Sequence, residues 1–370
     1  MMSLLERAYT EGYNEAMETV PVEPPQEDDD IQVHDIEGLA TKKFFDVVPA
    51  SGYAKNEYSA IWPVLMSTDV DDARAEMNYP YCVYGKGDKV VVSCDDEPSQ
   101  TITPYKECFA IFNLTPNKTY TWKQYQGTKV LSSGTFKTIG RMKWLKTPNN
   151  KYPHNLRDLG CTKELMDDGN GIAFGRIVRG EEPNKIEVDS ADHIYLRDQL
   201  GVTVQLNLRD AEKDPPRTDL FEKTYSYNIP AYSAAITGSS ANKKLIKYAF
   251  DALVTELAAG RNVLVNCWQG RDRTGTFCWL IQSLCGMSLG YTEAHWELSS
   301  FDRCENSKIW NWEEQSGGEL KTFIYRLVDL VRAQNNNAVI TAYTLAYYFA
   351  TKIIGITDEK INQLISILKQ

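Results

Sequence analysis

The chain has 370 residues, of which 42% are hydrophobic, enough for a large buried core and more than one compact domain usually holds. Its formal net charge of −10 argues against a general nucleic-acid-binding protein, because such proteins need a basic face to displace counterions from phosphates. The 8 cysteines show neither the close pairs of a zinc site nor the density of a small disulfide scaffold, so we interpret them as mostly reduced thiols.

The first 40 residues are predicted to be a flexible acidic leader. Residues 3–18 have the pattern of a short amphipathic helix, but the prolines between positions 21 and 25 and the acidic run 27–30 then supply a helix breaker and a self-repelling segment. No stretch approaches the roughly 18 uncharged apolar residues of a membrane-spanning helix. We therefore expect no stable membrane insertion and a cytoplasmic protein, or a secreted one if a signal peptide has been removed.

Residues 41–146 are predicted to form an all-β sandwich. Short alternating runs rich in Tyr, Val, Thr and Phe recur here, separated by turn signals such as 85–88, 95–98 and 116–118. The predicted strands are 81–84, 90–93, 110–113 and 119–125. The stretch 113–122, followed by 134–138, resembles the last strands of fibronectin type III-like modules, a fold that carries no function by itself.

The remaining residues, 147–370, are predicted to be an α/β domain. After the polar break 147–150, strand and helix patterns alternate along the chain. The clearest elements are a strand at 202–208, a helix at 241–258, a buried strand at 262–266 and a helix at 275–285. Two unlike domains are therefore expected in series.

The chemistry is predicted to lie in the loop that follows the buried strand 262–266. This strand leads directly into Cys267, and Arg273 and Thr274 close the loop before an apolar helix. Phosphoryl transfer without a metal needs a nucleophile that is anionic near neutral pH, and a thiol with a pKa of about 8.5 becomes one at a helix N-terminus surrounded by N–H donors. We therefore predict that Cys267 forms a phosphocysteine intermediate, with no metal and no cofactor.

The other loop residues have separate predicted roles. The spacing of Cys267 and Arg273 lets the backbone curl with its N–H groups inward, while the guanidinium forks onto two phosphoryl oxygens. Gly270 permits the tight curl, and the Thr274 hydroxyl is placed to donate a hydrogen bond to the Cys267 sulfur. The loop residues expected to contact the substrate are Trp268, Gln269, Gly270 and Arg271.

These residues carry a family resemblance. Residues 266–275 resemble the signature loop of protein tyrosine phosphatases, and their end is similar to the Lys-Asp-Arg-Thr-Gly of the bacterial tyrosine/phosphoinositide phosphatase subgroup. The segments 155–160, 175–179 and 355–361 resemble that subgroup in the same order, so the resemblance spans about 150–370. It implies the protein tyrosine phosphatase fold, a central sheet with flanking helices, and hydrolysis of phosphomonoesters by a cysteine-dependent phosphatase.

Three positions depart from the pattern of the family. Asn266 stands where His usually precedes the nucleophile, Asn207 stands where Asp is usual, and Cys161 replaces a Gly. The first change removes a hydrogen-bonding partner from the surroundings of the thiolate. We therefore expect an activity lower than the loop alone suggests.

The general acid, which protonates the leaving oxygen, has three candidates. Dual-specificity enzymes usually carry an Asp just after a strand resembling 227–230, but no carboxylate follows that segment here. The resemblance implies Asp272 as the acid, and Asp210 and Asp214 are its rivals.

Charged residues outside the loop are interpreted mainly as structural. Arg157, Asp158, Arg179 and Arg209 are expected to form a buried ion-pair lattice behind the loop. Arg179 is also a candidate substrate contact.

Two functions compete. The first is a phosphatase of the protein tyrosine/dual-specificity or phosphoinositide type, acting on phosphotyrosine, phosphoinositide or a soluble inositol phosphate. The charge of Arg271 favours substrates with several phosphates, whereas the acidity of the chain disfavours long residence on anionic membranes. The second is a catalytically weak phosphate-binding scaffold whose β module binds an unknown partner; the intact Cys267, Arg273 and Thr274 argue against it.

Overall fold

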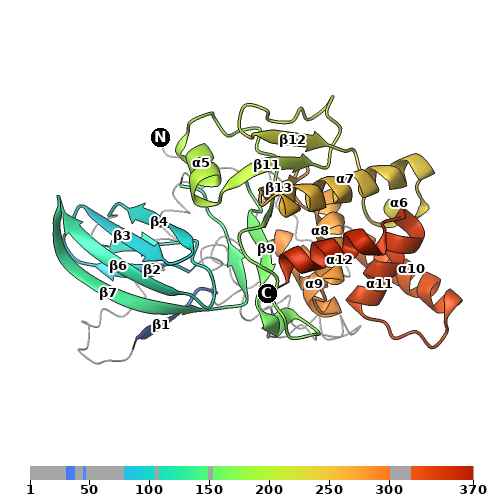
Figure 1. Cartoon of the computed structure of the whole chain (residues 1–370), viewed down its shortest axis with the longest axis horizontal. Coiled ribbons are helices and arrows are strands. Elements are labelled where there is room, and N and C mark those ends of the chain that lie inside the picture. Colours follow the sequence, from blue (N-terminus) through green and yellow to red (C-terminus); the bar gives the residue numbers. More distant parts are fainter. Residues whose placement is uncertain are drawn as a thin grey trace. The chain divides into compact units, whose positions relative to one another are not determined.

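The computed structural model describes residues 31–37, 45–46, 79–104, 108–148, 153–300 and 318–369. These residues fall into two compact units, one that ends at Leu145 and one that begins at Lys146 (Figure 1). Among the helices so described, none is long and apolar enough to cross a membrane.

The first unit is built from β-strands. Its sheets are a five-stranded one in the order β1-β7-β6-β3-β4 and a pair of antiparallel strands, β2 and β5. The strands are β1 (Gln32–Asp35), β2 (Tyr81–Tyr84), β3 (Lys89–Cys94), β4 (Glu97–Ile102), β5 (Cys108–Ile111), β6 (Thr119–Gln126) and β7 (Lys129–Ile139), and β8 (Met142–Trp144) follows them. The strands predicted at 81–84, 90–93 and 119–125 are confirmed, and the one predicted at 110–113 lies two residues earlier.

Two strands lie where none was predicted. β1 falls inside the predicted leader because its backbone pairs in parallel with β7, Gln32 opposite Phe136. The prediction of a flexible leader is therefore wrong for residues 31–37, and residues 1–30 lie outside the described part of the chain. β4 begins at Glu97, inside a predicted turn, and includes Pro98. A proline is tolerated there because β4 is an edge strand, whose outer side needs no N–H donor.

The hydrophobic core of this unit draws on both sheets. Val83, Phe109 and Ile111 of the two-stranded sheet pack with Tyr120 and Phe136 of the five-stranded one. Such a core between two sheets is what a β-sandwich needs. The fibronectin type III-like fold itself stays a prediction.

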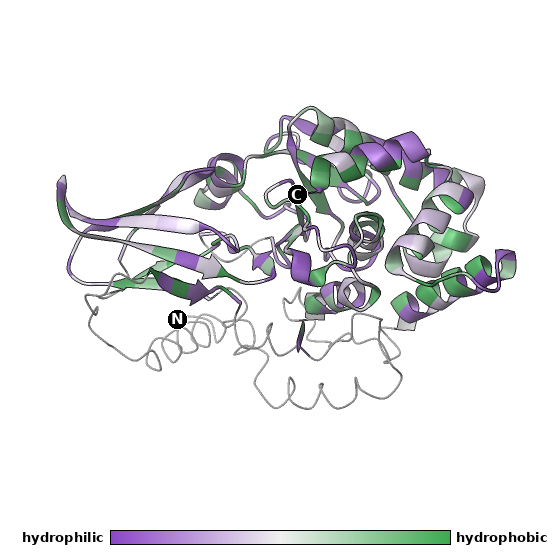
Figure 2. Ribbon diagram, turned by 60° about the horizontal axis from the view of Figure 1, so that its bottom comes forward, coloured by the Kyte–Doolittle hydropathy of each residue, from purple (hydrophilic) through white to green (hydrophobic). Residues whose placement is uncertain are grey.

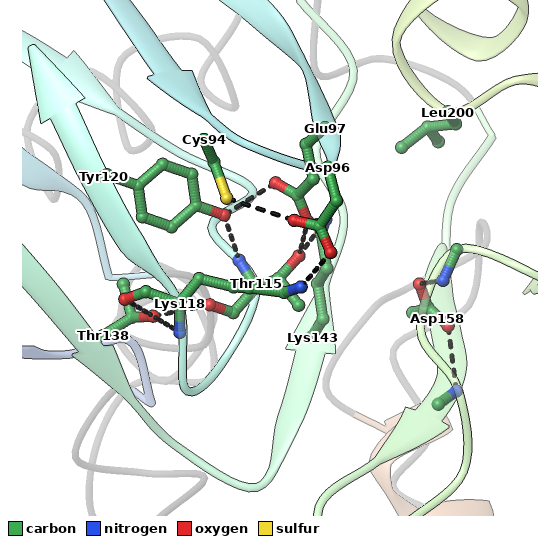
Figure 3. A network of polar contacts seen from close by, with 12 residues as sticks. Cys94, Asp96, Glu97, Thr115, Lys118, Tyr120, Thr138, Lys143, Asp158 and Leu200 are labelled. Carbon is green, nitrogen blue, oxygen red and sulfur yellow. Dashed lines mark hydrogen bonds and ion pairs between the residues drawn. The ribbon is translucent and has the colours of Figure 1, made fainter. Parts of the chain in front are cut away.

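A polar network surrounds Tyr120 at the start of β6 (Figure 3). Its hydroxyl donates to Glu97 Oε2 at 2.7 Å and accepts from the amide of Thr115 at 2.9 Å. Lys143 Nζ donates to the Thr115 hydroxyl at 2.7 Å. A tyrosine hydroxyl that bonds the backbone a few residues upstream resembles the tyrosine corner of immunoglobulin-type sandwiches, and here it fixes the turn into β6.

The second unit has an α/β fold. Its sheet runs in the order β12-β11-β13-β10-β9, parallel except between β10 and β9. The elements are β9 (Arg157–Cys161), η2 (Lys163–Leu165), β10 (Ile177–Gly180), α5 (Ala191–Ile194), η3 (Tyr195–Gln199), β11 (Val202–Asn207), β12 (Lys223–Ser226), α6 (Tyr232–Thr237), α7 (Ser240–Ala258), β13 (Asn262–Asn266), α8 (Asp272–Leu284), α9 (Leu289–Glu297), η4 (Leu298–Ser300), α10 (Gly318–Gln334), α11 (Ala342–Tyr348), η5 (Phe349–Ile354) and α12 (Asp358–Leu368).

Helices pack on this sheet as expected for an α/β domain. α7 contacts β11, β12 and β13, and α8 contacts β10. Figure 2 shows hydrophobic and hydrophilic residues on the same helices, as expected where one side of a helix covers a sheet. The predicted strands 202–208 and 262–266 and the helix 241–258 are confirmed. α8 begins three residues before the predicted 275, because polar residues of the loop form its first turn.

The parallel strands bring their carboxyl ends to one edge of the sheet. Asn266, the last residue of β13, lies opposite Gly180 of β10 and Asn207 of β11. In open α/β sheets, ligands bind outside this edge. The loop that begins at Cys267 leaves the sheet at this point.

Candidate active site

The loop between β13 and α8 has its carbonyl groups fixed from one side. The carbonyl of Trp268 accepts from the Glu182 amide at 3.2 Å, and the carbonyl of Gln269 accepts from Asn155 Nδ2 at 3.1 Å. The carbonyl of Gly270 accepts from Asn155 Nδ2 at 3.2 Å and from Arg179 Nη2 at 2.5 Å. In a trans peptide the C=O and the next N–H point in opposite directions. The amides of the next three residues therefore point away from these donors.

Gly270 lets the loop pack tightly on the end of β10. Its φ is +64°, and a Cβ at this position would lie 2.4 Å from the carbonyl carbon and oxygen of Gly180. Both the left-handed backbone and the close approach require glycine. The tight curl predicted for Gly270 is thus seen directly.

We expect Gly270→Ala to lower the free energy of unfolding by about 2 kcal/mol or more, since the new methyl group must displace backbone atoms. Gly169 is a matched control: its φ is +72°, but nothing lies within 4 Å of its Cβ position. Gly169→Ala should cost only the backbone strain, about 1 kcal/mol. Chemical denaturation of both variants measures the difference. Equal losses would mean that the loop can move off Gly180 without cost.

Arg179 lies behind the loop, where its side chain is only 1% exposed. Its guanidinium donates to the Gly270 carbonyl and contacts His295 Nδ1 and Ser299 Oγ, both at 3.4 Å. Among the described residues, the groups that bond the Arg179 guanidinium are thus a carbonyl, a neutral imidazole and a hydroxyl, none of which carries a charge. Burial lowers the pKa of Arg179. Arg179 therefore holds the loop from behind, and its predicted contact with the substrate stays a prediction.

Arg157 reaches the same partners from β9. It donates to Asn155 Oδ1 at 2.6 Å, to the His295 carbonyl at 3.1 Å and to Ser299 Oγ at 3.2 Å. Burial and the two nearby guanidiniums hold the pKa of His295 well below its usual range, so that its ring is neutral. Two of the four residues predicted as a lattice, Arg157 and Arg179, thus converge behind the loop.

The other two members of that predicted lattice have different partners. Asp158 accepts from the amides of Gly160 at 2.8 Å and Gly175 at 2.7 Å, and so fixes turns (Figure 3). Arg209 forms ion pairs with Glu182 and Asp214.

Asp272, in the first turn of α8, is held by two neighbours. Its carboxylate accepts from Arg271 Nε and Nη2, both at 2.9 Å, and from the Tyr232 hydroxyl at 2.7 Å. That hydroxyl accepts in turn from Trp296 Nε1 at 2.8 Å. The Asp272 side chain remains 40% exposed, so a bound molecule can reach it.

Tyr232 is a site residue that the sequence reasoning missed. Its backbone has a φ of +49°, and its amide donates to the Thr276 hydroxyl at 3.1 Å. A bulky residue in this region is strained, and such strain gathers at functional sites. Burial, and next the charge of Asp272, raise the pKa of Tyr232 well above its usual value, so the hydroxyl stays a donor. Its position two residues after the segment 227–230, where an acid was sought, was the available signal.

Arg273 and Thr274 complete the first turn of α8. The structure shows no hydrogen bond or ion pair between the half-buried Arg273 guanidinium and any described residue. The Thr274 hydroxyl is buried and likewise has no partner among the described residues. The hydrogen bond predicted from Thr274 to Cys267 is therefore not formed in this structure.

The rival acids occupy other positions. Asp214 is buried and accepts from Asn184 Nδ2 and, at 3.2 Å, from Asn207 Nδ2. An Asp in place of Asn207 would put two carboxylates side by side, which explains that departure. Asp210 accepts from the amide of Glu212 at 3.1 Å and shapes the turn after β11.

Asn266 is held inside the sheet. Its Oδ1 accepts from Gln205 Nε2 at 3.0 Å. The lower activity expected from this residue stays a prediction.

A third acidic residue, Glu182, contacts the loop through its backbone. Its amide donates to Trp268, and its side chain pairs with Arg209. Burial, and next the charge of Asp214, raise its pKa to about 7 against the opposing effect of Arg209. The signal in the sequence was its place two residues after β10, whose carboxyl end adjoins that of β13.

Comparison with known proteins places this geometry in a family. A search of the curated proteins found no match. The model of the tyrosine phosphatase family matches residues 150–370, which contain the loop and every residue described around it. The chain therefore belongs to the tyrosine phosphatase family.

Proposed function

We propose that this chain hydrolyses phosphomonoesters through a phosphocysteine on Cys267. The observation that carries the proposal is the set of loop carbonyls bound from behind, which turns the amides of Gln269, Gly270 and Arg271 to the opposite side. Successive amides that point the same way make an anion-binding concavity. Arg273, whose guanidinium has no bonded partner among the described residues, adds the charge that a phosphoryl group needs.

In the first step the Cys267 thiolate attacks phosphorus. The S–P bond forms as the P–O bond to the leaving group breaks, and the leaving oxygen takes the electron pair of that bond. Asp272 gives this oxygen a proton. Arg273 and the loop amides stabilise the charge on the equatorial oxygens, so no cofactor is required.

In the second step water attacks the phosphocysteine. Asp272, now a carboxylate, takes a proton from the water, the P–S bond breaks, and its electron pair returns to Cys267 as thiolate. The Thr274 hydroxyl, which has no partner among the described residues, is available to donate to the departing sulfur. The products are inorganic phosphate and the free alcohol or phenol.

Asp272 must lose part of its pairing with Arg271 before it can hold a proton. An arriving phosphate dianion competes for the Arg271 guanidinium and would loosen that pair. Substrate binding and readiness of the acid are thereby linked.

The substrates we consider are phosphotyrosine in a protein, a phosphoinositide or a soluble inositol phosphate. We also propose that residues 41–146, extended by β1, are a fibronectin type III-like module that binds a partner, and that 147–370 are the phosphatase domain of a cytoplasmic protein. The tyrosine corner at Tyr120 supports the first of these assignments.

The test is hydrolysis of 4-nitrophenyl phosphate. We expect turnover that orthovanadate inhibits competitively, since vanadate mimics five-coordinate phosphorus. Activity should stay within about twofold in excess chelator, because the loop amides and Arg273 supply the charge stabilisation. Loss on chelation, restored by a divalent ion, would contradict the mechanism. Phosphate binding without turnover would favour the scaffold alternative.

A further inference from the structure

The indole of Trp268 lies at the rim of the phosphate loop. Trp268 follows the nucleophile directly, and its side chain is 53% exposed. Its carbonyl is fixed by the amide of Glu182. Gly180 of β10 lies opposite Asn266 of β13, and Glu182 and Trp268 each follow their member of this pair by two residues. The two residues therefore lie side by side at the same part of the sheet edge.

Arg209 joins these two side chains. Its guanidinium carbon lies 5.7 Å from the centre of the Trp268 ring, within cation–π range, and its Nη1 donates to Glu182 Oε2. Asp214 Oδ2 lies 3.5 Å from the same Nη1. Arg209 and Glu182 are both mostly covered, so Glu182 helps to hold the guanidinium that lies against the indole.

The guanidinium groups at the rim are already paired with carboxylates of the protein. Arg209 faces the carboxylates of Glu182 and Asp214, and the 13% exposed Arg271 is bound in a fork by Asp272. Because the reacting phosphate itself competes with Asp272 for Arg271, neither guanidinium is left over to bind a second phosphate. What this rim offers to the group attached to the reacting phosphate is a flat apolar surface.

On the basis of the proposed function, we propose that Trp268 determines substrate specificity by stacking against a flat aromatic group attached to the phosphate. Glu182 and Arg209 are positioning residues, which hold the indole in place for this contact. The chemical class so favoured is an aryl phosphate, at the expense of alcohols that carry several phosphates.

The experiment compares two non-hydrolysable dianions, phenylphosphonate and methylphosphonate, by calorimetry on the full chain at pH 8.5. Both probe the phosphate loop, and only the first can stack. We expect the wild type to bind phenylphosphonate about tenfold more tightly, a typical value for an aromatic contact. Trp268→Ala should reduce the ratio of the two affinities to about one. Glu182→Gln and Arg209→Lys should each reduce it to about threefold, because the indole loses its support.

Glu187→Gln is the matched control. It makes the same change on an exposed carboxylate of the same segment and should leave the ratio unchanged. A wild-type ratio near one, or an unaltered ratio in Trp268→Ala, would overturn the stacking. Unaltered ratios in both Glu182→Gln and Arg209→Lys would overturn the positioning roles. Tighter binding of inositol 1,4-bisphosphate than of phenylphosphonate would overturn the aryl class. If neither phosphonate binds, it is the proposed phosphate site that fails.

Discussion

Cys267→Ser should lower kcat for 4-nitrophenyl phosphate by a factor on the order of 10⁴ or more, the scale of nucleophile replacement in enzymes. The serine hydroxyl is not ionised at neutral pH and is a poor nucleophile, whereas a thiol near positive charge ionises readily. The loop amides and Arg273 remain, so calorimetry should show orthovanadate affinity within about tenfold of the wild type. Initial-rate assays at saturating substrate measure the first effect.

Cys94→Ser is the control for this substitution. Cys94 is a partly exposed thiol in β3 whose Sγ donates to Asp96 Oδ1 at 3.3 Å, far in the sequence from the loop. The control should keep full activity. If Cys267→Ser retained even a few per cent of the wild-type kcat, the phosphocysteine intermediate would have to be abandoned.

The parts of the site that are local in sequence could be predicted. β13 is a short apolar run, the loop contains a glycine, and α8 is apolar over most of its length, so strand, loop and helix follow from neighbouring residues. The start of α8 was placed late because apolar periodicity marks only its buried part. Polar residues of a first turn leave no periodic signal.

The parts of the site that depend on distant segments could not be predicted. Asn155, Glu182 and Tyr232 reach the loop from just before β9, from just after β10 and from the start of α6, and each has an ordinary local sequence. The same limit applies to β1, which pairs with β7, a strand much later in the chain. Sequence patterns report which face of an element is buried, whereas side-chain contacts across the sheet edge require the fold.

Asp272→Asn should slow hydrolysis of an alkyl phosphate by about 10²–10⁴-fold and that of 4-nitrophenyl phosphate much less. An alkoxide leaves only if it receives a proton in the transition state, whereas nitrophenolate departs almost unaided. The amide keeps the size of the carboxyl group and its hydrogen bond from Tyr232, but it cannot give up an acidic proton. The ratio of kcat/KM for the two substrates therefore isolates proton transfer from substrate binding.

Tyr232→Phe and Asp210→Asn separate proton transfer from positioning. Loss of the Tyr232 hydroxyl frees one oxygen of Asp272, so Tyr232→Phe should slow both substrates by a similar factor and leave their ratio near that of the wild type. Asp210→Asn should change neither rate, because that carboxylate bonds within its own turn.

If Asp272→Asn slowed both substrates equally, Asp272 would only hold Arg271 in place. The variant Glu182→Gln, assayed with the same two substrates, would then test Glu182 as the acid. A leaving-group dependence in that variant alone would assign the proton to Glu182, since its raised pKa keeps part of it protonated near neutral pH.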